Sequence, residues 1–423
     1  MSRRKHLIIG SGTAALSALE EIRRLASEDE IKLVTMEACP PYSPASLPYL
    51  LSGRITENEI WKGDESYFKD LRSTLATGKE VTRIVPEKRR VMYRDGASEH
   101  YDTLLIASGS EPIKPAIRGM DTVGARAFRV LADCRSLLRD LEHKKDLAIL
   151  GAGIVGMKLA LALTEKRYRI SIIDKEENIL PLYFNEEAAD TIRDIFIEHN
   201  VRLLTGHAIT SVARKNGKIT IAFTNGGSID VDILINATGV RSRISFLEGT
   251  GIQISNGILV DRTMRTDVEQ VYAAGDVAEA YDFFTGQLKM SAIMPSAARQ
   301  GRVAGANMAG GHLEYEGGIA ATALSFFGNR AFSMGLPAPV NREAQVWKEK
   351  DDRKRSFKKL IFSGERLVGG MFVNEQVDPG IIFHLIKNRV NMTSYKEALF
   401  ERTKPLSNPW LNSLKFSRAN IQP

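Results

Sequence analysis

The amino-acid sequence predicts an α/β fold in which one strand–turn–helix module occurs twice, followed by a smaller C-terminal α+β module. Two observations predict this fold. A short apolar strand runs into a glycine-rich turn after residues 7–9 and again after residues 147–150. Each copy is followed much later by a second apolar strand that ends in an Ala-hydroxyl-Gly triplet, at 107–109 and at 237–239. A repeat of this kind indicates a duplicated module.

The two glycine-rich turns have the spacing of a dinucleotide-binding turn in a Rossmann-like module. Their small residues are Gly10, Gly12 and Ala15 in the first copy and Gly151, Gly153 and Gly156 in the second. The first glycine permits a tight turn, the second lets the backbone approach a pyrophosphate, and the third small residue lets helix and strand pack closely. The phosphates then meet the N-terminus of the following helix, where unpaired N–H groups favour negative charge.

An acidic residue follows the next strand of each module. Glu37 comes after the strand at 31–36, and Asp174 comes after the strand at 170–173. An acid at this position accepts hydrogen bonds from the ribose hydroxyls of a bound dinucleotide. The pattern therefore predicts two dinucleotide sites; the alternative is a pair of Rossmann-like modules that bind nothing.

A third segment, 271–277, is a strand of small residues that ends in Gly275-Asp276. In this order the motifs resemble the FAD-dependent pyridine nucleotide-disulfide oxidoreductase superfamily, over about residues 5–390. The resemblance implies that the first module binds FAD and that the second, inserted in it, binds NAD. The domains would be an FAD domain at 1–115 and 248–321, an NAD domain at 116–247 and a C-terminal α+β interface domain at 322–423.

The same resemblance implies the residues of both sites. Asp276 would hydrogen-bond the ribityl chain of FAD, although a helix cap or turn residue is the alternative. The helix that begins near Pro295 and Ser296 and stops at Gly310 would point its N-terminus at the flavin pyrimidine. The full FAD set is Gly10, Gly12, Ala15, Glu37, Ser108, Gly109, Gly275, Asp276, Pro295 and Ser296. The NAD set is Gly151, Gly153, Gly156, Asp174 and Gly239.

Cysteines divide this superfamily into branches. Segment 41–49 resembles relatives that carry a redox cysteine, but Ala45 stands at that position. Cys39 and Cys134 are the only cysteines, too few for an iron–sulfur cluster, and we expect both to be structural. We predict no metal site. The chain thus resembles the cysteine-free branch: ferredoxin and rubredoxin reductases, and FAD subunits of multi-subunit aldehyde or 2-oxoacid oxidoreductases.

The expected function is electron exchange between NAD(H) and an iron–sulfur, ferredoxin-like protein or subunit, within a larger complex. Two alternatives stay open: a stand-alone NADH oxidase or peroxidase, and a non-catalytic redox sensor that binds FAD and NADH. Relatives commonly have Glu two residues after the third glycine of the NAD motif, where this chain has Lys158. Lys158 is a candidate for the nicotinamide side of the site; the alternative is a lysine that extends to solvent.

Composition and charge restrict the partners. The chain has 423 residues, of which 43% are hydrophobic and 26% charged, and a net charge of +7. That surplus is too modest to indicate nucleic acid, and no run of about 18 apolar residues indicates a membrane span. Arg3-Arg4 before an apolar stretch is similar to the start of an export signal, but the turn at Gly10 favours a strand, so we expect a cytoplasmic protein.

The C-terminal part reads as a hairpin, with strands at 356–362 and 367–373. In relatives this domain closes over the flavin and often forms a homodimer interface. Phe326 and Phe327 are candidates to lie near the flavin ring, with core packing as the alternative. The basic segment 347–359 is either a solvated edge or a docking site for an acidic carrier, and Trp410 begins an arm.

Overall fold

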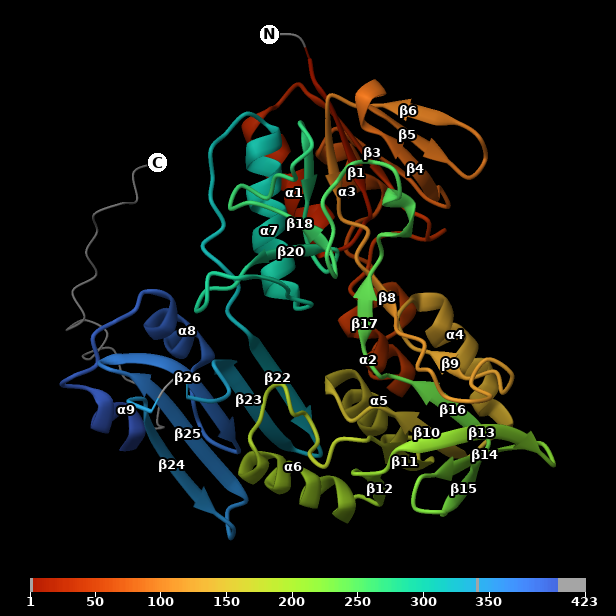
Figure 1. The fold of residues 1–423 in the computed structure, drawn as a ribbon, viewed down its shortest axis with the longest axis vertical. Coiled ribbons are helices and arrows are strands. Elements are labelled where there is room, and N and C mark those ends of the chain that lie inside the picture. The colour runs from red at the N-terminus through yellow and green to blue at the C-terminus, as the bar shows by residue number, and fades with distance from the viewer. Residues whose placement is uncertain (1–2, 340–341, 402–423) are drawn as a thin grey trace. The chain divides into compact units, whose positions relative to one another are not determined.

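The computed structural model describes residues 3–339 and 342–401, so Trp410 lies outside the described residues. The chain forms two compact units (Figure 1). The first runs to Lys175 and resumes over Leu204–Ile319, and the second comprises Glu176–Leu203 and the chain from Ala320 onward. The first unit contains both glycine-rich turns. The predicted division into FAD, NAD and C-terminal domains stays a prediction.

The first glycine-rich turn belongs to a parallel sheet with the strand order β19-β7-β1-β2-β3. These strands are β1 (Lys5–Ile9), β2 (Glu30–Val34), β3 (Ser73–Ala76), β7 (Thr103–Ile106) and β19 (Val271–Ala273). Ile9 pairs with Val34 on one side and with Ile106 on the other. Because β1 lies between β2 and β7, the turn after β1 opens between the ends of its two neighbours.

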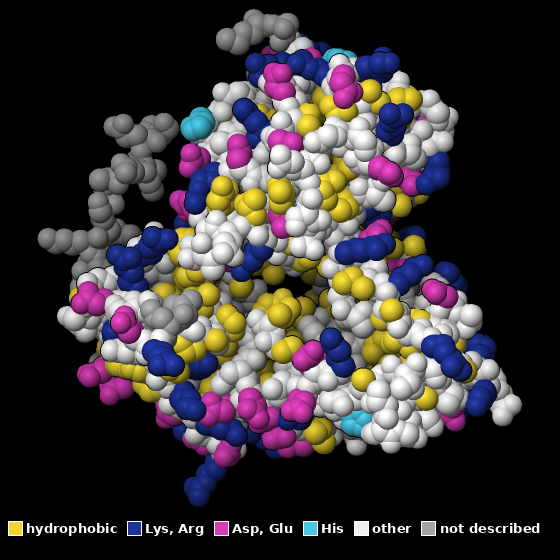
Figure 2. Space-filling view, in the orientation of Figure 1, with side chains coloured by type: hydrophobic (Ala, Val, Ile, Leu, Met, Phe, Trp, Pro, Cys, Tyr) yellow, Lys and Arg dark blue, Asp and Glu magenta, His cyan; other side chains and the backbone are white. Residues whose placement is uncertain are grey.

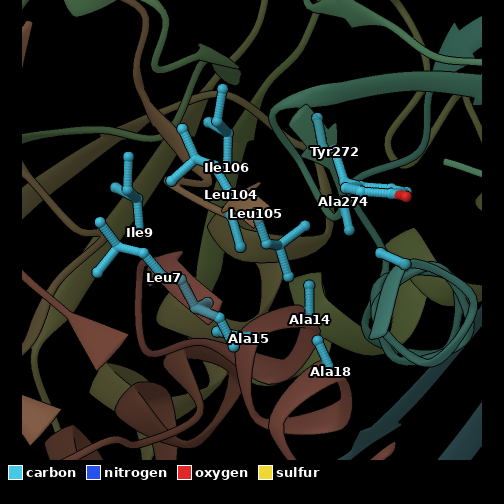
Figure 3. Packing of buried hydrophobic residues seen from close by; sticks show 14 of the residues in the cluster. Leu7, Ile9, Ala14, Ala15, Ala18, Leu104, Leu105, Ile106, Tyr272 and Ala274 are labelled. Atoms are coloured by element: carbon cyan, nitrogen blue, oxygen red, sulfur yellow. The ribbon is translucent and has the colours of Figure 1, made fainter. Parts of the chain in front are cut away.

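Helix α1 (Thr13–Leu25) follows this turn, and it packs against α7 (Met294–Met308) from much later in the chain. A Cβ atom on Gly301 would lie 2.1 Å from the Ala14 carbonyl oxygen, and one on Gly305 would lie 2.6 Å from that of Ala18. Figure 3 shows Ala14 and Ala18 beside the apolar side chains of β1 and β7. The predicted helix at 295–310 is confirmed, with Gly310 just beyond its end.

The second glycine-rich turn lies in a similar sheet, in which β11, β10, β16 and β9 are neighbours in that order. Their bounds are β9 (Arg126–Ala127), β10 (Asp146–Leu150), β11 (Arg169–Ile173) and β16 (Ile233–Asn236). Helices α4 (Leu131–Asp140) and α5 (Ile154–Glu165) accompany it, and β12 (Val201–Leu204) spans the boundary between the units. The predicted pair of Rossmann-like modules is confirmed.

The chain passes between these modules on two adjacent strands. β8 (Ser110–Pro112) leaves the first module and β17 (Val240–Ser242) returns to it, and the two pair antiparallel. The second module is therefore inserted into the first, as predicted. Smaller sheets and helices complete the unit: β4 (Val81–Val85), β5 (Arg90–Tyr93), β6 (Ser98–His100), β13 (Ile209–Lys215), β14 (Lys218–Phe223), β15 (Ser228–Val231), β18 (Ile258–Leu259), β20 (Ala278–Tyr281), β21 (Leu288–Met290), α2 (Leu47–Ser52) and α3 (Glu65–Asp70).

The second unit is an antiparallel sheet with helices. Its strand order is β22-β23-β26-β25-β24, and the predicted hairpin is β25–β26. The bounds are β22 (Ala321–Phe326), β23 (Asn329–Gly335), β24 (Gln345–Asp351), β25 (Ser356–Ser363), β26 (Arg366–Val373), α6 (Glu186–Glu198), α8 (Pro379–Lys387) and α9 (Lys396–Glu401). Phe326 stacks on Phe196, and Phe327 stacks on His199. Both phenylalanines therefore have packing partners within their own unit.

The basic segment 347–359 finds its counter-charges inside the second unit. Lys348 lies 2.8 Å from the Glu187 carboxylate and Arg355 lies 2.7 Å from that of Glu198, both on α6. Figure 2 shows acidic and basic side chains side by side over α6 and β24. Lys358 and Lys359 are only 5% and 7% exposed. Most cations of this segment are therefore paired or buried, and docking of an acidic carrier on it stays a prediction.

No helix among the described residues is long and apolar enough to cross a bilayer.

Candidate dinucleotide sites

The turn between β1 and α1 is built around Gly10. Its φ of +118° is a conformation that favours glycine, and an added Cβ would lie 2.2 Å from the Ala107 carbonyl oxygen. Gly12 is the N-cap of α1, and an added Cβ there would meet no atom within 4 Å. Ala15 is fully buried in the core below the turn. The turn therefore presents open backbone and a helix N-terminus, which is the arrangement that holds a pyrophosphate.

The second turn repeats this geometry. Gly151 has a φ of +112°, and an added Cβ would lie 2.4 Å from the Ala237 carbonyl oxygen. Gly153 is the N-cap of α5 and has open space around it. An added Cβ on Gly156 would lie 1.9 Å from the Gly151 carbonyl oxygen, so a side chain there would separate α5 from the turn. The second turn can hold a pyrophosphate for the same reasons as the first.

A cleft of about 410 Å³ opens at the first turn, a volume within the usual range for small-molecule sites. It is bounded by the ends of β1, β2 and β7 and by residues of β4 and β8. Five residues of the predicted FAD set line it: Gly10, Gly12, Glu37, Ser108 and Gly109. The cradle under Gly10 and the acid at Glu37 fit an adenine dinucleotide, so the residues present fit FAD.

Glu37 is held in place by Tyr42, which the sequence analysis did not single out. The Tyr42 hydroxyl donates a hydrogen bond of 2.6 Å to a Glu37 carboxylate oxygen. The same hydroxyl accepts one of 2.7 Å from the backbone N–H of Leu131, the first residue of α4. The carboxylate expected to bind ribose is therefore tied to the start of α4, a helix of the second module.

Asp276 lies behind Ser110 and Arg129, which both line the cleft. Its carboxylate accepts hydrogen bonds of 2.9 Å from the Ser110 hydroxyl and from the Arg129 guanidinium. Arg129 was missed in the sequence because it lies 147 residues before Asp276. The predicted contact of Asp276 with a ribityl chain stays a prediction, and Arg129 is the group that orients this carboxylate.

The remaining predicted FAD residues lie at the start of α7 and next to it. The Gly275 N–H donates a 2.7 Å hydrogen bond to the side-chain oxygen of the fully buried Gln300. Pro295 is in the first turn of α7, and the Ser296 hydroxyl accepts a hydrogen bond of 3.1 Å from Ser291. These residues do not line the cleft at Gly10. Their predicted role, in which the N-terminus of α7 points at the flavin pyrimidine, stays a prediction.

In the second module, Asp174 lies beside the glycine-rich turn that begins at Gly151, as expected for a residue that binds the ribose. Its carboxylate accepts a 2.7 Å hydrogen bond from the Ala152 N–H, between the first two glycines. Gly239 has a φ of +120° and follows β16. Gly151, Gly153, Asp174 and Gly239 thus lie at the ends of neighbouring parallel strands. This is the edge of a sheet at which dinucleotides bind.

Lys158 lies on α5 and is half-buried. Burial lowers the pKa of its ammonium group. In the part of the chain that the structure describes, its side chain has no hydrogen bond or ion pair. Because the Lys158 ammonium group has no partner among the described residues, it is available to a ligand of the second module. Its contact with nicotinamide stays a prediction.

Neither cysteine is activated. Burial raises the pKa of the Cys134 thiol to about 11, and it also raises that of Cys39, where the Glu37 charge contributes. Cys134 is fully buried, and its sulfur faces the Leu47 carbonyl oxygen at 3.8 Å. A thiolate is the reactive form of cysteine, so both thiols are poor nucleophiles. Ala45, at the position of the redox cysteine in similar sequences, has no reactive group.

Comparison with known proteins agrees with this geometry. The family model described as pyridine nucleotide-disulphide oxidoreductase matches residues 4–306. The NADH-dependent phenylglyoxylate dehydrogenase subunit epsilon of Aromatoleum evansii is 35% identical over 392 residues, or 92% of this chain and 93% of that protein. The NADH oxidase of Methanocaldococcus jannaschii is 28% identical over 400 residues, or 88% of this chain and 89% of that protein.

Among solved structures, the water-forming NADH oxidase from Lactobacillus brevis, bound to NADH, superposes with a TM-score of 0.84. The two chains are 22% identical, and the match covers 92% of each. At this identity the likeness concerns the fold. Together with the family match and the two dinucleotide turns, it shows that this chain belongs to the pyridine nucleotide-disulphide oxidoreductase family, as an NAD(H)-dependent flavoprotein oxidoreductase with FAD and NAD(H) as its cofactors.

Proposed function

We propose that this chain exchanges electrons between NAD(H) and a one-electron iron–sulfur protein or subunit, as part of a larger oxidoreductase. The observation that carries the proposal is the absence of a usable thiol among the described residues. Ala45 occupies the position of the redox cysteine, and burial keeps Cys39 and Cys134 protonated. Catalysis by a redox-active cysteine, as in disulfide reductases, therefore has no suitable residue among the described residues.

The residues of the first unit would bind and orient the two cofactors. Gly10 and Gly12 would hold the FAD pyrophosphate and Glu37 the adenosine ribose. Asp174 would take the NAD(H) ribose in the second module. FAD supplies, when bound, the conversion between two-electron and one-electron transfer. The protein itself would contribute alignment and charge.

The relative from Aromatoleum evansii supports a place in a complex. Its name describes a subunit of an NADH-dependent dehydrogenase, and it matches this chain over nearly the whole length of both. A subunit that reacts with NADH, yet has only two cysteines of its own, needs another chain to carry iron–sulfur clusters. We therefore infer that the carrier is a separate polypeptide.

A second candidate function is oxidation of NADH by oxygen. It is favoured by the relative from Methanocaldococcus jannaschii, whose name is NADH oxidase and which is 28% identical over 400 residues. The two functions differ in the acceptor alone, so the same cofactor sites serve both.

The experiment compares acceptors. NADH oxidation by the purified flavoprotein is measured with a bacterial ferredoxin under argon, and with air-saturated buffer and no carrier. We expect turnover with ferredoxin to exceed oxygen consumption by about tenfold or more, equivalent to about 1.4 kcal/mol in the barrier. Equal or faster turnover with oxygen would overturn the proposal in favour of the oxidase.

A matched pair of variants tests the thiol argument separately. Cys39→Ser and Cys134→Ala together remove both thiols of the chain. We expect carrier-dependent turnover within twofold of the unaltered protein. A collapse of turnover with retained FAD and an unchanged circular dichroism spectrum would mean that a thiol takes part.

A further inference from the structure

Four cationic side chains line the cleft at the first turn, and three of them have a carboxylate partner. The pairs are Lys79 with Asp95 at 2.5 Å, Arg94 with Glu80 at 2.5 Å and Arg129 with Asp276 at 2.9 Å. Arg243 also lines the cleft. Within the described ranges, no carboxylate lies within hydrogen-bond distance of its guanidinium group.

The surroundings of Arg243 leave part of its guanidinium group unsatisfied. Its Nε–H is buried and has no hydrogen-bond partner, and one terminal nitrogen faces the thioether sulfur of Met36. The pKa of the Glu80 carboxyl group is lowered mainly by its hydrogen bonds with Arg94, and the charge of Arg243 contributes less. Arg94 donates hydrogen bonds to both Glu80 carboxylate oxygens, at 2.6 and 2.5 Å. A buried donor without a partner is costly, and a ligand that supplies acceptors would remove that cost.

The backbone of Arg243 is fixed at one side of the cleft and its side chain reaches the other. Its N–H donates a 3.0 Å hydrogen bond to the Gly109 carbonyl oxygen, and its own carbonyl accepts one of 3.0 Å from the Ser108 hydroxyl. Ser108 and Gly109 follow β7, whereas Met36 follows β2. Since β1 lies between β7 and β2, the side chain extends across the end of β1, where the Gly10 turn begins.

We propose that Arg243 binds the ADP half of FAD and supplies a cation to its pyrophosphate. This inference rests on the proposed placement of FAD at the first turn. The N-terminus of α1 offers only about half a unit of positive charge, while a pyrophosphate carries two negative charges. Arginine can donate parallel hydrogen bonds to phosphate oxygens in a fixed planar geometry. The Met36 contact places the guanidinium group next to Glu37, which we propose to bind the adenosine ribose.

The experiment measures how tightly the holoprotein holds FAD. Serial dilution releases FAD, and the rise in flavin fluorescence gives its Kd. The variant is Arg243→Gln. Its matched control is Arg83→Gln, which removes the same charge from an exposed position on β4, next to a strand residue that lines the cleft. We expect Arg243→Gln to raise the Kd for FAD by about tenfold or more, as for loss of a charge-assisted hydrogen bond, and Arg83→Gln to change it less than twofold.

Competition identifies which half of FAD the arginine contacts. Added ADP should displace FAD, and its inhibition constant Ki, corrected for the Kd of FAD in each variant, should be at least about fivefold higher in Arg243→Gln than in the unaltered protein and in Arg83→Gln. The Ki of FMN, which lacks the adenosine half, should be the same in all three proteins. An unchanged Ki for ADP in Arg243→Gln, or a raised Ki for FMN alone, would overturn the assignment to the ADP half.

A second variant guards against failure to fold. Arg243→Met keeps an aliphatic chain against Met36 and removes the charge, and we expect the same rise in Kd. If both Arg243 variants hold FAD as tightly as Arg83→Gln, the inference is wrong while the FAD site itself stands. If the unaltered protein binds no FAD, the placement of FAD at the first turn has failed instead.

Discussion

The Tyr42 hydroxyl and the Glu37 carboxylate are joined by a hydrogen bond of 2.6 Å. Burial and the adjacent Glu37 charge raise the pKa of Tyr42, so the hydroxyl keeps its proton and acts as the donor. It also accepts the N–H of Leu131, a buried group at the start of α4. One hydroxyl therefore fixes the acid of the first site and caps a helix of the second module.

We predict that Tyr42→Phe weakens both FAD binding and stability. Removal of the hydroxyl leaves the Leu131 N–H without this acceptor and Glu37 without its donor, so we expect a loss of about 1–3 kcal/mol in the free energy of unfolding. The Kd for FAD should rise several-fold in a fluorescence titration. Tyr49→Phe, at a position that is 38% exposed, is the control and should change neither quantity. Unchanged stability in Tyr42→Phe would show that water replaces the hydroxyl.

We predict that Arg129 and Asp276 are energetically coupled. Their ion pair is mostly shielded from solvent, with 26% and 18% of the side chains exposed, so screening is partial. In a double-mutant cycle with Arg129→Gln and Asp276→Asn, urea unfolding should give a coupling of about 0.5–3 kcal/mol. FAD retention should fall further in Asp276→Asn than in Arg129→Gln. Additive effects would mean that the two side chains act independently.

The fold was largely predictable because its signals are local. The turns at Gly10 and Gly151 each show their glycine spacing within a few residues of sequence, although the atoms that exclude a side chain there come from Ala107 and Ala237, far along the chain. The hairpin β25–β26 is indicated by alternating residues, and the helix α7 by a proline at its start. These patterns are local, and the structure confirms the corresponding elements.

The charge partners were not predictable, since they come from distant segments. Arg355 pairs with Glu198 across 157 positions, so part of the positive charge of the basic segment has a partner that the sequence does not reveal. Arg129 meets Asp276 across 147 positions. Arg243 meets Met36 across 207. A single sequence contains no record of which distant side chains the topology brings together.

We predict that NADH is preferred over NADPH because of Asp174. The Ala152 N–H holds its carboxylate at the second turn, where it would accept hydrogen bonds from the ribose hydroxyls and repel a 2′-phosphate. The rate of flavin reduction at low concentration should be at least about tenfold higher with NADH. Asp174→Ala should reduce that ratio mainly by weakening NADH. Comparable rates with both nucleotides in the unaltered protein would contradict the assignment.

The last prediction concerns Lys158 and pH. Burial lowers the pKa of its ammonium group below the ordinary value of 10.5, so the charge is present at neutral pH and is lost as the pH rises through a value lower than 10.5. If Lys158 donates a hydrogen bond to the nicotinamide carboxamide, the KM for NADH should rise over that interval. Lys158→Met should have a raised KM at neutral pH, by about threefold to tenfold, and no further rise.

The matched control is Lys166→Met, which removes the same charge from an exposed residue at the C-terminal end of the same helix. Its KM for NADH should follow the unaltered protein from pH 7 to 10, measured by stopped-flow reduction of the flavin so that the carrier plays no part. Because Lys158 has no acidic partner among the described residues, its titration is governed by burial and by NADH itself. The rate of flavin reduction at saturating NADH should therefore stay constant to a higher pH than the rate at low NADH. Identical profiles for Lys158→Met and the unaltered protein would place the ammonium group in solvent, away from nicotinamide.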